Sequence, residues 1–199
     1  MGSIPIGYLL AKKAKKIDIR TQGSGNIGTT NIGRVLGWKY ALFVLLGDIN
    51  KGILPLVLAY MLPFHSEGID QSSFLVFLSL AAVLGHSKSM WLKFTGGKGV
   101  ATTLGTLLAL FFPVALIALA VFLFTLWISR YVSLSSICAA TSIPISMWLW
   151  QCPVAYQWYG ILITVLIVYF HQENIQRLRK GTEFKFALKF IIFTSCSEE

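Results

Sequence analysis

The sequence predicts an all-α integral membrane protein: one domain over residues 1–199, built as a bundle of about seven transmembrane helices. Composition is the first observation, with 55% hydrophobic and only 13% charged residues, whereas soluble domains average about 25% charged. The second is a set of apolar runs near the roughly 20 residues that a bilayer span requires. These runs cover residues 40–64, 74–85, 100–127, 131–150 and 154–170.

The third observation is the placement of the net charge of +9. A nucleic-acid partner would account for the charge itself, but the basic residues are confined to particular segments. They gather at 12–39, 88–98, Arg130 and 177–189, with only Lys51 elsewhere. The loops at 63–73 and 151–159 contain no Lys or Arg. The positive-inside rule therefore predicts the basic set in the cytoplasm, the N-terminus outside and the C-terminus inside, with no nucleic-acid partner.

Residues 4–11 are expected to form the first helix. At 1.5 Å per residue this segment is too short to cross the hydrocarbon, so we predict a truncated first span. It lacks the basic region and cleavage site of a signal peptide. The runs 40–64 and 74–85 are the second and third spans, joined by an outside loop.

The run 100–127 is expected to form two helices of about 13 and 15 residues with a turn near Pro113. One long helix would put Arg130 outside and would reverse the side of the basic C-terminal segment. The first of the two is short, so we expect it to be partly re-entrant or to lie in thinned bilayer. The runs 131–150 and 154–170 complete the seven spans.

The first polar motif, GSGNIGTTNIGR at 23–34, is rich in glycine and short donors. Its glycines permit backbone conformations closed to other residues, and Arg34 offers a planar fork suited to phosphate. We expect substrate-binding residues here, among them Gly23, Ser24, Gly25, Asn26 and Asn31. The alternative is a flexible polar linker between helices.

The second motif, GGKGVATT at 96–103, sets Lys98 among glycines before a helix that opens at Val100. The N–H groups at such a helix start are available to an anion. A Walker A loop would need Gly at position 92 and Ser or Thr after the lysine, where this chain has Leu92 and Gly99, so nucleotide hydrolysis is disfavoured. The alternative is a glycine break between membrane helices.

The third motif, HQENIQRL at 171–178, is expected at the inner end of the last span. The spacing of three places His171, Asn174 and Arg177 on one helix face. His171 is a candidate proton acceptor or, when protonated, a partner of phosphate. The basic residues Arg177, Arg179 and Lys180 are interpreted as lipid-facing anchors. All three motifs thus fall on the predicted cytoplasmic side.

Two intramembrane charges, Asp48 and Lys51, interrupt an apolar run at a spacing of three. Such charges are costly and therefore paired and often functional, so an internal ion pair and a role in the substrate pocket both stay open. Ser133 is either a helix cap or a donor in the site.

Other polar features are interpreted without a function. His65 and Asp70 match the His-x4-Asp signature of the large glycerolipid acyltransferase group, but they lie in a predicted outside loop without basic residues, so we interpret the match as coincidence. Cys138, Cys152 and Cys196 show no paired spacing. We interpret them as packing residues and expect no metal or redox site.

The three motifs, in this order and spacing among apolar segments, resemble those of the bacterial acyl-phosphate:glycerol-3-phosphate acyltransferase family, the PlsY type. The resemblance covers residues 2–183 and includes the segments 2–7, 48–52, 130–134 and 181–183, with His86 and Trp91 before the second motif. It implies a seven-helix enzyme of the bacterial cell membrane with a cytoplasmic active site. This enzyme would transfer a fatty acyl group from acyl phosphate to glycerol 3-phosphate, giving lysophosphatidic acid and phosphate, the first acylation step of phospholipid biosynthesis.

The resemblance also assigns residues. It implies catalytic or substrate-binding roles for Ser24, Arg34, Lys98, Ser133, His171 and Asn174, a glycerol 3-phosphate site at Gly96, Gly97 and Gly99, and an architectural role for Glu183. No cofactor or metal is implied, and the donor is neither acyl-CoA nor acyl carrier protein. The implied partners are both substrates, the lipid bilayer and a soluble acyl-phosphate synthase of the PlsX type. Residues 184–199 form an apolar tail that departs from the family pattern.

Two other classes compete with an enzyme. A transporter of phosphorylated solutes also has glycine breaks and buried charge, but it should show polar motifs on both faces or inverted repeats, and neither is found. A membrane anchor for a soluble protein would leave Asp48, Lys51 and the first motif without a purpose.

Overall fold

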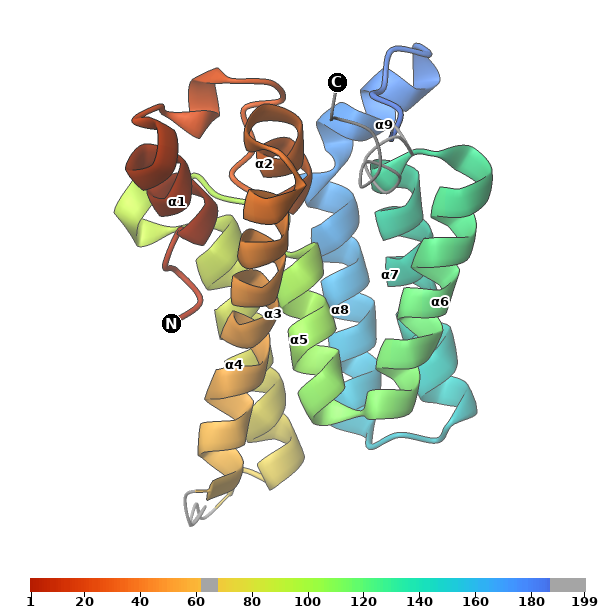
Figure 1. Ribbon diagram of the computed structural model, residues 1–199. Coiled ribbons are helices and arrows are strands. Elements are labelled where there is room, and N and C mark those ends of the chain that lie inside the picture. Colours follow the sequence, from red (N-terminus) through yellow and green to blue (C-terminus); the bar gives the residue numbers. More distant parts are fainter. Residues whose placement is uncertain (62–67, 187–199) are drawn as a thin grey trace, which may run out of the picture.

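The structure is a computed structural model that describes residues 1–61 and 68–186. Within these residues every regular element is a helix, so the predicted all-α membrane fold is confirmed. The long helices run side by side, and the turns between α5 and α6 and between α7 and α8 lie at one end of the bundle (Figure 1). The elements α1, α2 and α9 gather at the other end. His65 and Cys196 lie outside the described residues.

The N-terminal elements are short. Helix α1 spans Ile6–Lys15, a 3-10 turn (η1) spans Ile19–Thr21, and α2 spans Thr29–Leu36. They share a small apolar cluster that includes Ala11, Ile19, Ile32 and Val44. The second half of the motif at 23–34 forms the start of α2. Gly28 provides the N-cap position, and its carbonyl accepts the N–H groups of Asn31 and Ile32.

Four helical stretches are long and apolar enough to cross a membrane, within the described ranges. They are Trp38–Met61 (α3), Gln71–Leu92 (α4, Gln71–Ser87, with the 3-10 turn η2, Met90–Leu92), Phe112–Ser129 (α6) and Val132–Leu149 (α7). Helices α8 (Val154–Phe170) and α9 (Gln172–Arg179) add a fifth if the pair, bent by 60°, counts as one span. The count of seven spans and the orientation stay predictions.

The run 100–127 divides into two helices, as expected, but the lengths differ from the prediction. Helix α5 spans Val100–Leu110, with 11 residues, and α6 has 18. The break falls at Phe111, since Pro113 lies in the first turn of α6. Proline is tolerated there because the first-turn N–H groups have no intrahelical partner. The proline therefore belongs to the helix rather than to the turn.

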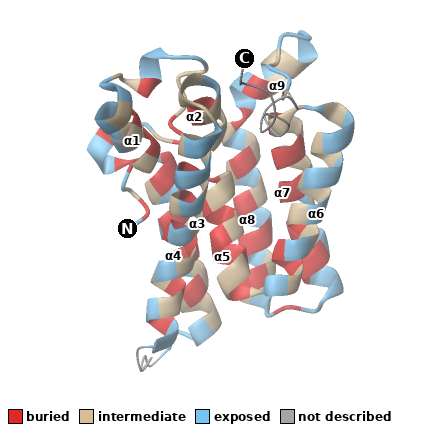
Figure 2. Ribbon diagram, in the orientation of Figure 1, coloured by how far each residue is buried: buried red, intermediate tan, exposed pale blue. Residues whose placement is uncertain are grey.

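Burial follows the apolar pattern of a membrane bundle. The main core is formed by α3 to α8 and includes Leu56, Leu107, Ile143 and Tyr159. By contrast, α6 keeps large apolar side chains such as Phe124 and Trp127 exposed, and its outer face is pale blue in Figure 2. Exposed aromatic and aliphatic groups in such number suit a lipid environment. Cys152 packs in the core, as expected, and Cys138 is partly buried.

Helices α3 and α5 approach each other closely in this core. A Cβ on Gly52 would overlap the Thr102 carbonyl and lie 2.6 Å from the Thr106 nitrogen. A Cβ on Gly105 would overlap the Ile49 carbonyl. Glycines on both sides therefore let the first turns of α5 pack directly on α3, beside Lys51.

Candidate active site

The candidate site is built around the buried carboxylate of Glu183, which follows α9. Its Oε1 accepts hydrogen bonds from Asn174 Nδ2 at 2.6 Å and from Ser133 Oγ at 2.8 Å. Its Oε2 accepts one from Arg177 Nε at 2.7 Å. A carboxylate with three donors is held in one orientation, so Glu183 fixes α7, α9 and the chain after α9 to one another.

Of the two roles that the sequence leaves open for Ser133, helix cap or donor in the site, the structure excludes the cap, because the Ser133 hydroxyl donates to Glu183. Arg177 is not a lipid-facing anchor: its side chain is 28% exposed and contacts the carboxylates of Glu183 and Glu173.

Lys98 and Asn174 link the second motif to the third. The Lys98 ammonium donates to Asn174 Oδ1, and the Asn174 amide donates onward to Glu183. This chain of bonds settles which way the amide faces. Burial, helped by the positive charge of Arg177, lowers the pKa of Lys98 to about 8. Lys98, which directly precedes the N-cap of α5, is therefore a mostly protonated cation near neutral pH, held by its bond to Asn174 on α9.

Arg34 on α2 brings the first motif to the same group. Arg34 is exposed as a residue, and its guanidinium carbon lies 4.6 Å from the ring centroid of Phe184. Burial lowers its pKa, while Glu183 opposes this effect and Arg177 adds to it. Arginine stays charged under any such shift. Arg34 also acts electrostatically on Lys98, so two cations face the same region.

The chain from 182 to 186 is a strap across this end of the bundle. It carries Glu183 to the donors described above and Phe184 to Arg34. Its end is fixed by the Phe186 N–H, which donates to the Arg130 carbonyl at 2.7 Å, and by Lys185, which lies over the Tyr131 ring. The strap thus joins α2, α9 and the start of α7.

His171 lies at the bend between α8 and α9 and is 3% exposed. His171, Asn174 and Arg177 were expected at the inner end of the last span; instead His171 marks a bend of 60°, and Asn174 and Arg177 lie beyond it on α9. His171 Nδ1 lies 2.8 Å from the Ile167 carbonyl. A carbonyl only accepts, so Nδ1 carries the proton and Nε2 of the neutral ring is left as an acceptor. The positive charge of Lys98 opposes a positive charge on this ring, which favours the neutral form.

The first motif is a clamped loop rather than a flexible linker. Asn31 is buried; its Nδ2 donates to the carbonyls of Gln22 at 3.0 Å and Asn26 at 2.8 Å, and its Oδ1 accepts the Ser24 N–H at 2.9 Å. Gly23 has φ +58° and a Cβ there would overlap Asn31 Oδ1, so only glycine fits. Asn26 Oδ1 in turn accepts the Gly28 N–H at 2.8 Å.

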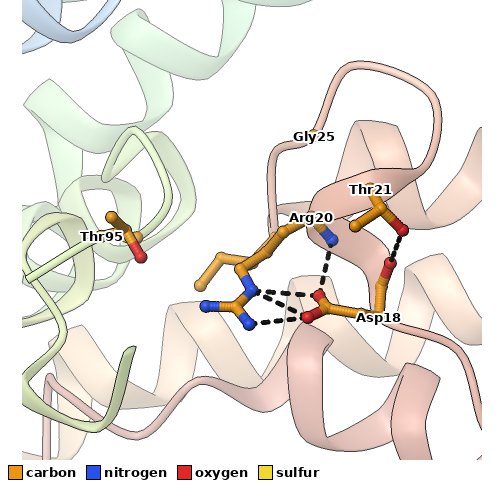
Figure 3. A pocket seen from close by; sticks show the side chains of 7 residues that line it. Asp18, Arg20, Thr21, Gly25 and Thr95 are labelled. Carbon is orange, nitrogen blue, oxygen red and sulfur yellow. Dashed lines mark hydrogen bonds and ion pairs between the residues drawn. The ribbon is translucent and has the colours of Figure 1, made fainter. Parts of the chain in front are cut away.

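A cavity of about 370 Å³ separates the first two motifs. Gly25 and Gly96 lie on its wall together with Asp18, Arg20, Thr21, Ile27 and Thr95. Figure 3 shows Arg20 turned toward Asp18, with Thr95 across the opening. The Arg20 guanidinium holds the pKa of Asp18 down at about 2. Sequence analysis missed these residues, although an Asp-x-Arg pair before a glycine loop is a usable signal.

The second motif turns tightly against α4. The Gly97 N–H donates to the His86 carbonyl at 3.2 Å, and Gly99 starts α5 with φ +79°. Beyond it, Thr102 and Thr103 are buried, and their hydroxyls have no partner in the described part of the chain. No cluster of metal-ligating side chains occurs among the described residues.

The structure therefore brings the predicted residues together in two groups. One group surrounds Glu183 and consists of Arg34, Lys98, Ser133, His171 and Asn174. The other, Gly23, Ser24, Gly25, Asn26 and Asn31, forms the clamped loop, which meets Gly96 across the cavity. In the second group the Asn31 amide is hydrogen-bonded within the loop itself. Its direct contact with substrate stays a prediction.

Known proteins resemble this chain in sequence and in fold. The sequence model of the family described as glycerol-3-phosphate acyltransferase matches residues 1–181. Glycerol-3-phosphate acyltransferase of Geotalea daltonii is 45% identical over 183 residues, covering 92% of this chain and 91% of the relative. The enzyme of the same name from Gloeobacter violaceus is 43% identical, covering 92% and 88%.

Two solved structures agree with the sequence matches. A crystal structure of PlsY (YgiH), an integral membrane glycerol 3-phosphate acyltransferase in its glycerol 3-phosphate form, has a TM-score of 0.87 and 42% identity and covers 97% of this chain and 94% of that one. The lysophosphatidic acid form has a TM-score of 0.84 and 41% identity, covering 97% and 93%. The chain is membrane-embedded, and it belongs to the glycerol-3-phosphate acyltransferase family.

Proposed function

We propose that this enzyme acylates glycerol 3-phosphate with a fatty acyl group from acyl phosphate and releases phosphate. The observation that carries the proposal is the pair of cations, Lys98 and Arg34, beside the neutral acceptor His171 at one end of a membrane bundle. Two phosphate-bearing substrates need such cations, and an acyl chain needs lipid access. The glycerol 3-phosphate and lysophosphatidic acid forms of the solved relative support the acceptor and the product.

Acyl phosphate is a mixed anhydride, so the transfer needs no covalent enzyme intermediate. The glycerol hydroxyl oxygen bonds to the acyl carbon, the bond from that carbon to the phosphate oxygen breaks, and inorganic phosphate leaves with the bond electrons. Positioning and charge stabilisation supply most of the acceleration in such a reaction. The hydroxyl proton passes either to His171 Nε2 or to the donor's own phosphate.

Each predicted residue has a role in this scheme. Lys98 and Arg34 hold the phosphates as point charge and planar fork. The N–H groups of Gly96, Gly97 and Gly99, and those of the loop from Gly23 to Asn26, are donors to phosphate oxygens. Ser24 and Asn174 stabilise the oxyanion that forms at the acyl carbon. Ser133 and Glu183 hold Asn174 and Arg177 in place. Asn31 fixes the conformation of the loop that carries Ser24.

We place the enzyme in the bacterial cell membrane with its site facing the cytoplasm. The support is the basic character of the segments around the site. Acyl phosphate is reactive, so a soluble synthase of the PlsX type that delivers it at this surface is the expected protein partner.

The experiment uses the purified full chain in detergent with acyl phosphate and radiolabelled glycerol 3-phosphate. Labelled lysophosphatidic acid should form together with one equivalent of phosphate. Acyl-CoA serves as the control donor, and the Arg34→Ala variant serves as the control for enzyme-independent transfer. Product from acyl-CoA alone, or equal product with the variant, would overturn the proposed donor or the proposed site.

A further inference from the structure

A buried charge cluster lies behind the second motif. Asp48 and Lys51 on α3 pair at 2.7 Å, and His86 on α4 places Nδ1 3.5 Å from both Asp48 Oδ1 and Lys51 Nζ. All three residues are at most 6% exposed. A buried ion pair contributes little to stability compared with apolar residues of similar size, so the cluster calls for a reason other than stability.

The opposite edge of the His86 ring contacts the glycine loop. A Cβ on Gly97 would overlap His86 Nε2 and lie 2.8 and 2.9 Å from two other atoms of the same ring. A Cβ on Gly96 would overlap the His86 carbonyl, which also accepts the Gly97 N–H. Neither glycine has a positive φ. Glycine is therefore needed at position 97 because of the His86 ring, and at position 96 because of the backbone carbonyls of His86 and Ser87, rather than because of backbone torsion.

The other end of the glycine loop 96–99 continues into α5, which packs on α3. Beyond Lys98, α5 packs its first turns on α3 through Gly52 and Gly105. Gly52 directly follows Lys51. Lys98 thus lies between two attachments, one through His86 and one through α5, and both lead to the 48–52 region of α3.

We propose that Asp48, Lys51 and His86 are positioning residues: the ion pair holds the His86 ring, the ring supports Gly97, and the loop places the Lys98 ammonium for its phosphate. This inference rests on the proposed function, in which Lys98 binds glycerol 3-phosphate. It predicts that disturbing the cluster weakens capture of glycerol 3-phosphate without unfolding the protein.

The first test removes the ion pair as a unit. Asp48→Leu combined with Lys51→Met removes both charges and leaves no lone buried ion. We expect the melting temperature to stay within a few degrees and the KM for glycerol 3-phosphate to rise at least fivefold, with kcat changed less than twofold. Ser79→Ala, which deletes another buried polar group of α4, should leave KM unchanged.

The second test asks whether the effect passes through Lys98. The dissociation constant for glycerol 3-phosphate is measured by calorimetry on the full chain, with and without Lys98→Ala. The pair removal should weaken binding at least fivefold in the wild-type background and less than twofold in the Lys98→Ala background. A protein that is merely destabilised would lose affinity equally in both.

The third test is a reciprocal rescue. Gly97→Ala should raise KM at least tenfold because its methyl group meets the His86 ring. Adding His86→Ala opens that space. The KM of the double variant for glycerol 3-phosphate should therefore be at least threefold lower than that of Gly97→Ala alone.

Three results would overturn the proposal: a wild-type KM in the folded pair-removal variant, equal losses in both Lys98 backgrounds, or strictly additive effects of Gly97→Ala and His86→Ala. A wild-type chain that neither binds nor acylates glycerol 3-phosphate would instead refute the proposed function.

Discussion

Lys98 and Asn174 are 76 positions apart in sequence, and yet the Lys98 ammonium donates directly to the Asn174 amide oxygen. Lys98 is partly desolvated and gains a hydrogen-bond acceptor in Asn174, and Asn174 in turn links it to Glu183. The second and third motifs are therefore one unit in the folded protein.

The pH dependence of substrate capture should follow Lys98. Its pKa of about 8 means that the ammonium form, which binds phosphate, is lost as pH rises above that value. We expect the KM for glycerol 3-phosphate to be flat from pH 7 to 7.5 and to rise by up to tenfold per pH unit above 8. Steady-state kinetics from pH 6.5 to 9.5 measure this rise.

Lys98→Arg is the control for this profile, because arginine keeps its charge throughout and should flatten the rise. Lys98→Ala should raise KM at every pH. Stability should move the opposite way: the folded pKa lies below the unfolded 10.5, so the unfolded chain binds more protons between about pH 8 and 10.5, and this group's contribution to unfolding free energy grows with pH there.

Glu183 should matter for stability as much as for activity. Glu183→Ala leaves Arg177, Asn174 and Ser133 without their shared acceptor, and each buried group left unpaired costs about 1–3 kcal/mol. We expect a melting temperature lower by several degrees and a large loss of kcat. Glu173→Ala is a matched control, because that carboxylate is 85% exposed and 3.8 Å from Arg177; a surface pair of this kind contributes about 0–1 kcal/mol. Equal effects of the two variants would contradict the central role of Glu183.

Asn31 should act through the shape of its loop. Asn31→Ala removes the acceptor for the Ser24 N–H and the donor to Gln22 and Asn26. We expect lower kcat/KM, at least tenfold, and faster proteolysis within residues 20–28, measured by mass spectrometry of digests. Asn26→Ala removes a single bond to Gly28 and should have a smaller effect on both. An Asn31→Ala loop that resists protease like the wild type would show that the clamp is not needed.

A substitution at His171 tests whether this side chain accepts the proton of the glycerol hydroxyl. His171→Gln removes the Nε2 acceptor, and loss of a general base typically costs about 10²- to 10⁴-fold in rate. We expect kcat to fall within that range, measured by release of inorganic phosphate. Activity within a few-fold of wild type would instead assign the proton to the departing phosphate.

The helices could be predicted because apolar runs of this length have few alternatives. The break near Pro113 also followed from charge placement, although its position and the helix lengths did not, since proline fits either a turn or the first turn of a helix. The bend at His171 escaped prediction for a similar reason. Spacing of three indicates a shared face only while the helix axis stays straight.

The sequence indicated which residues belong to the site, but it was less informative about the role of each one. Short amides read the same in a sequence whether they face a ligand or the backbone, and so Asn31 was expected to bind substrate while its amide is bonded to its own loop. Asp48 and Lys51 were recognised as a pair, but their contact with His86 depends on how α3 and α4 pack. Such long-range contacts leave no periodic signal.

The strap from 182 to 186 has no regular secondary structure of its own, and it is held by partners on α2, α7 and α9 and by the Arg130 carbonyl after α6. Its order therefore depends on those helices being assembled. Trypsin cleavage after Lys180 or Lys185 would then serve as a simple gauge of assembly: slow cutting in the correctly docked enzyme, and rapid cutting in any preparation whose helices have come apart.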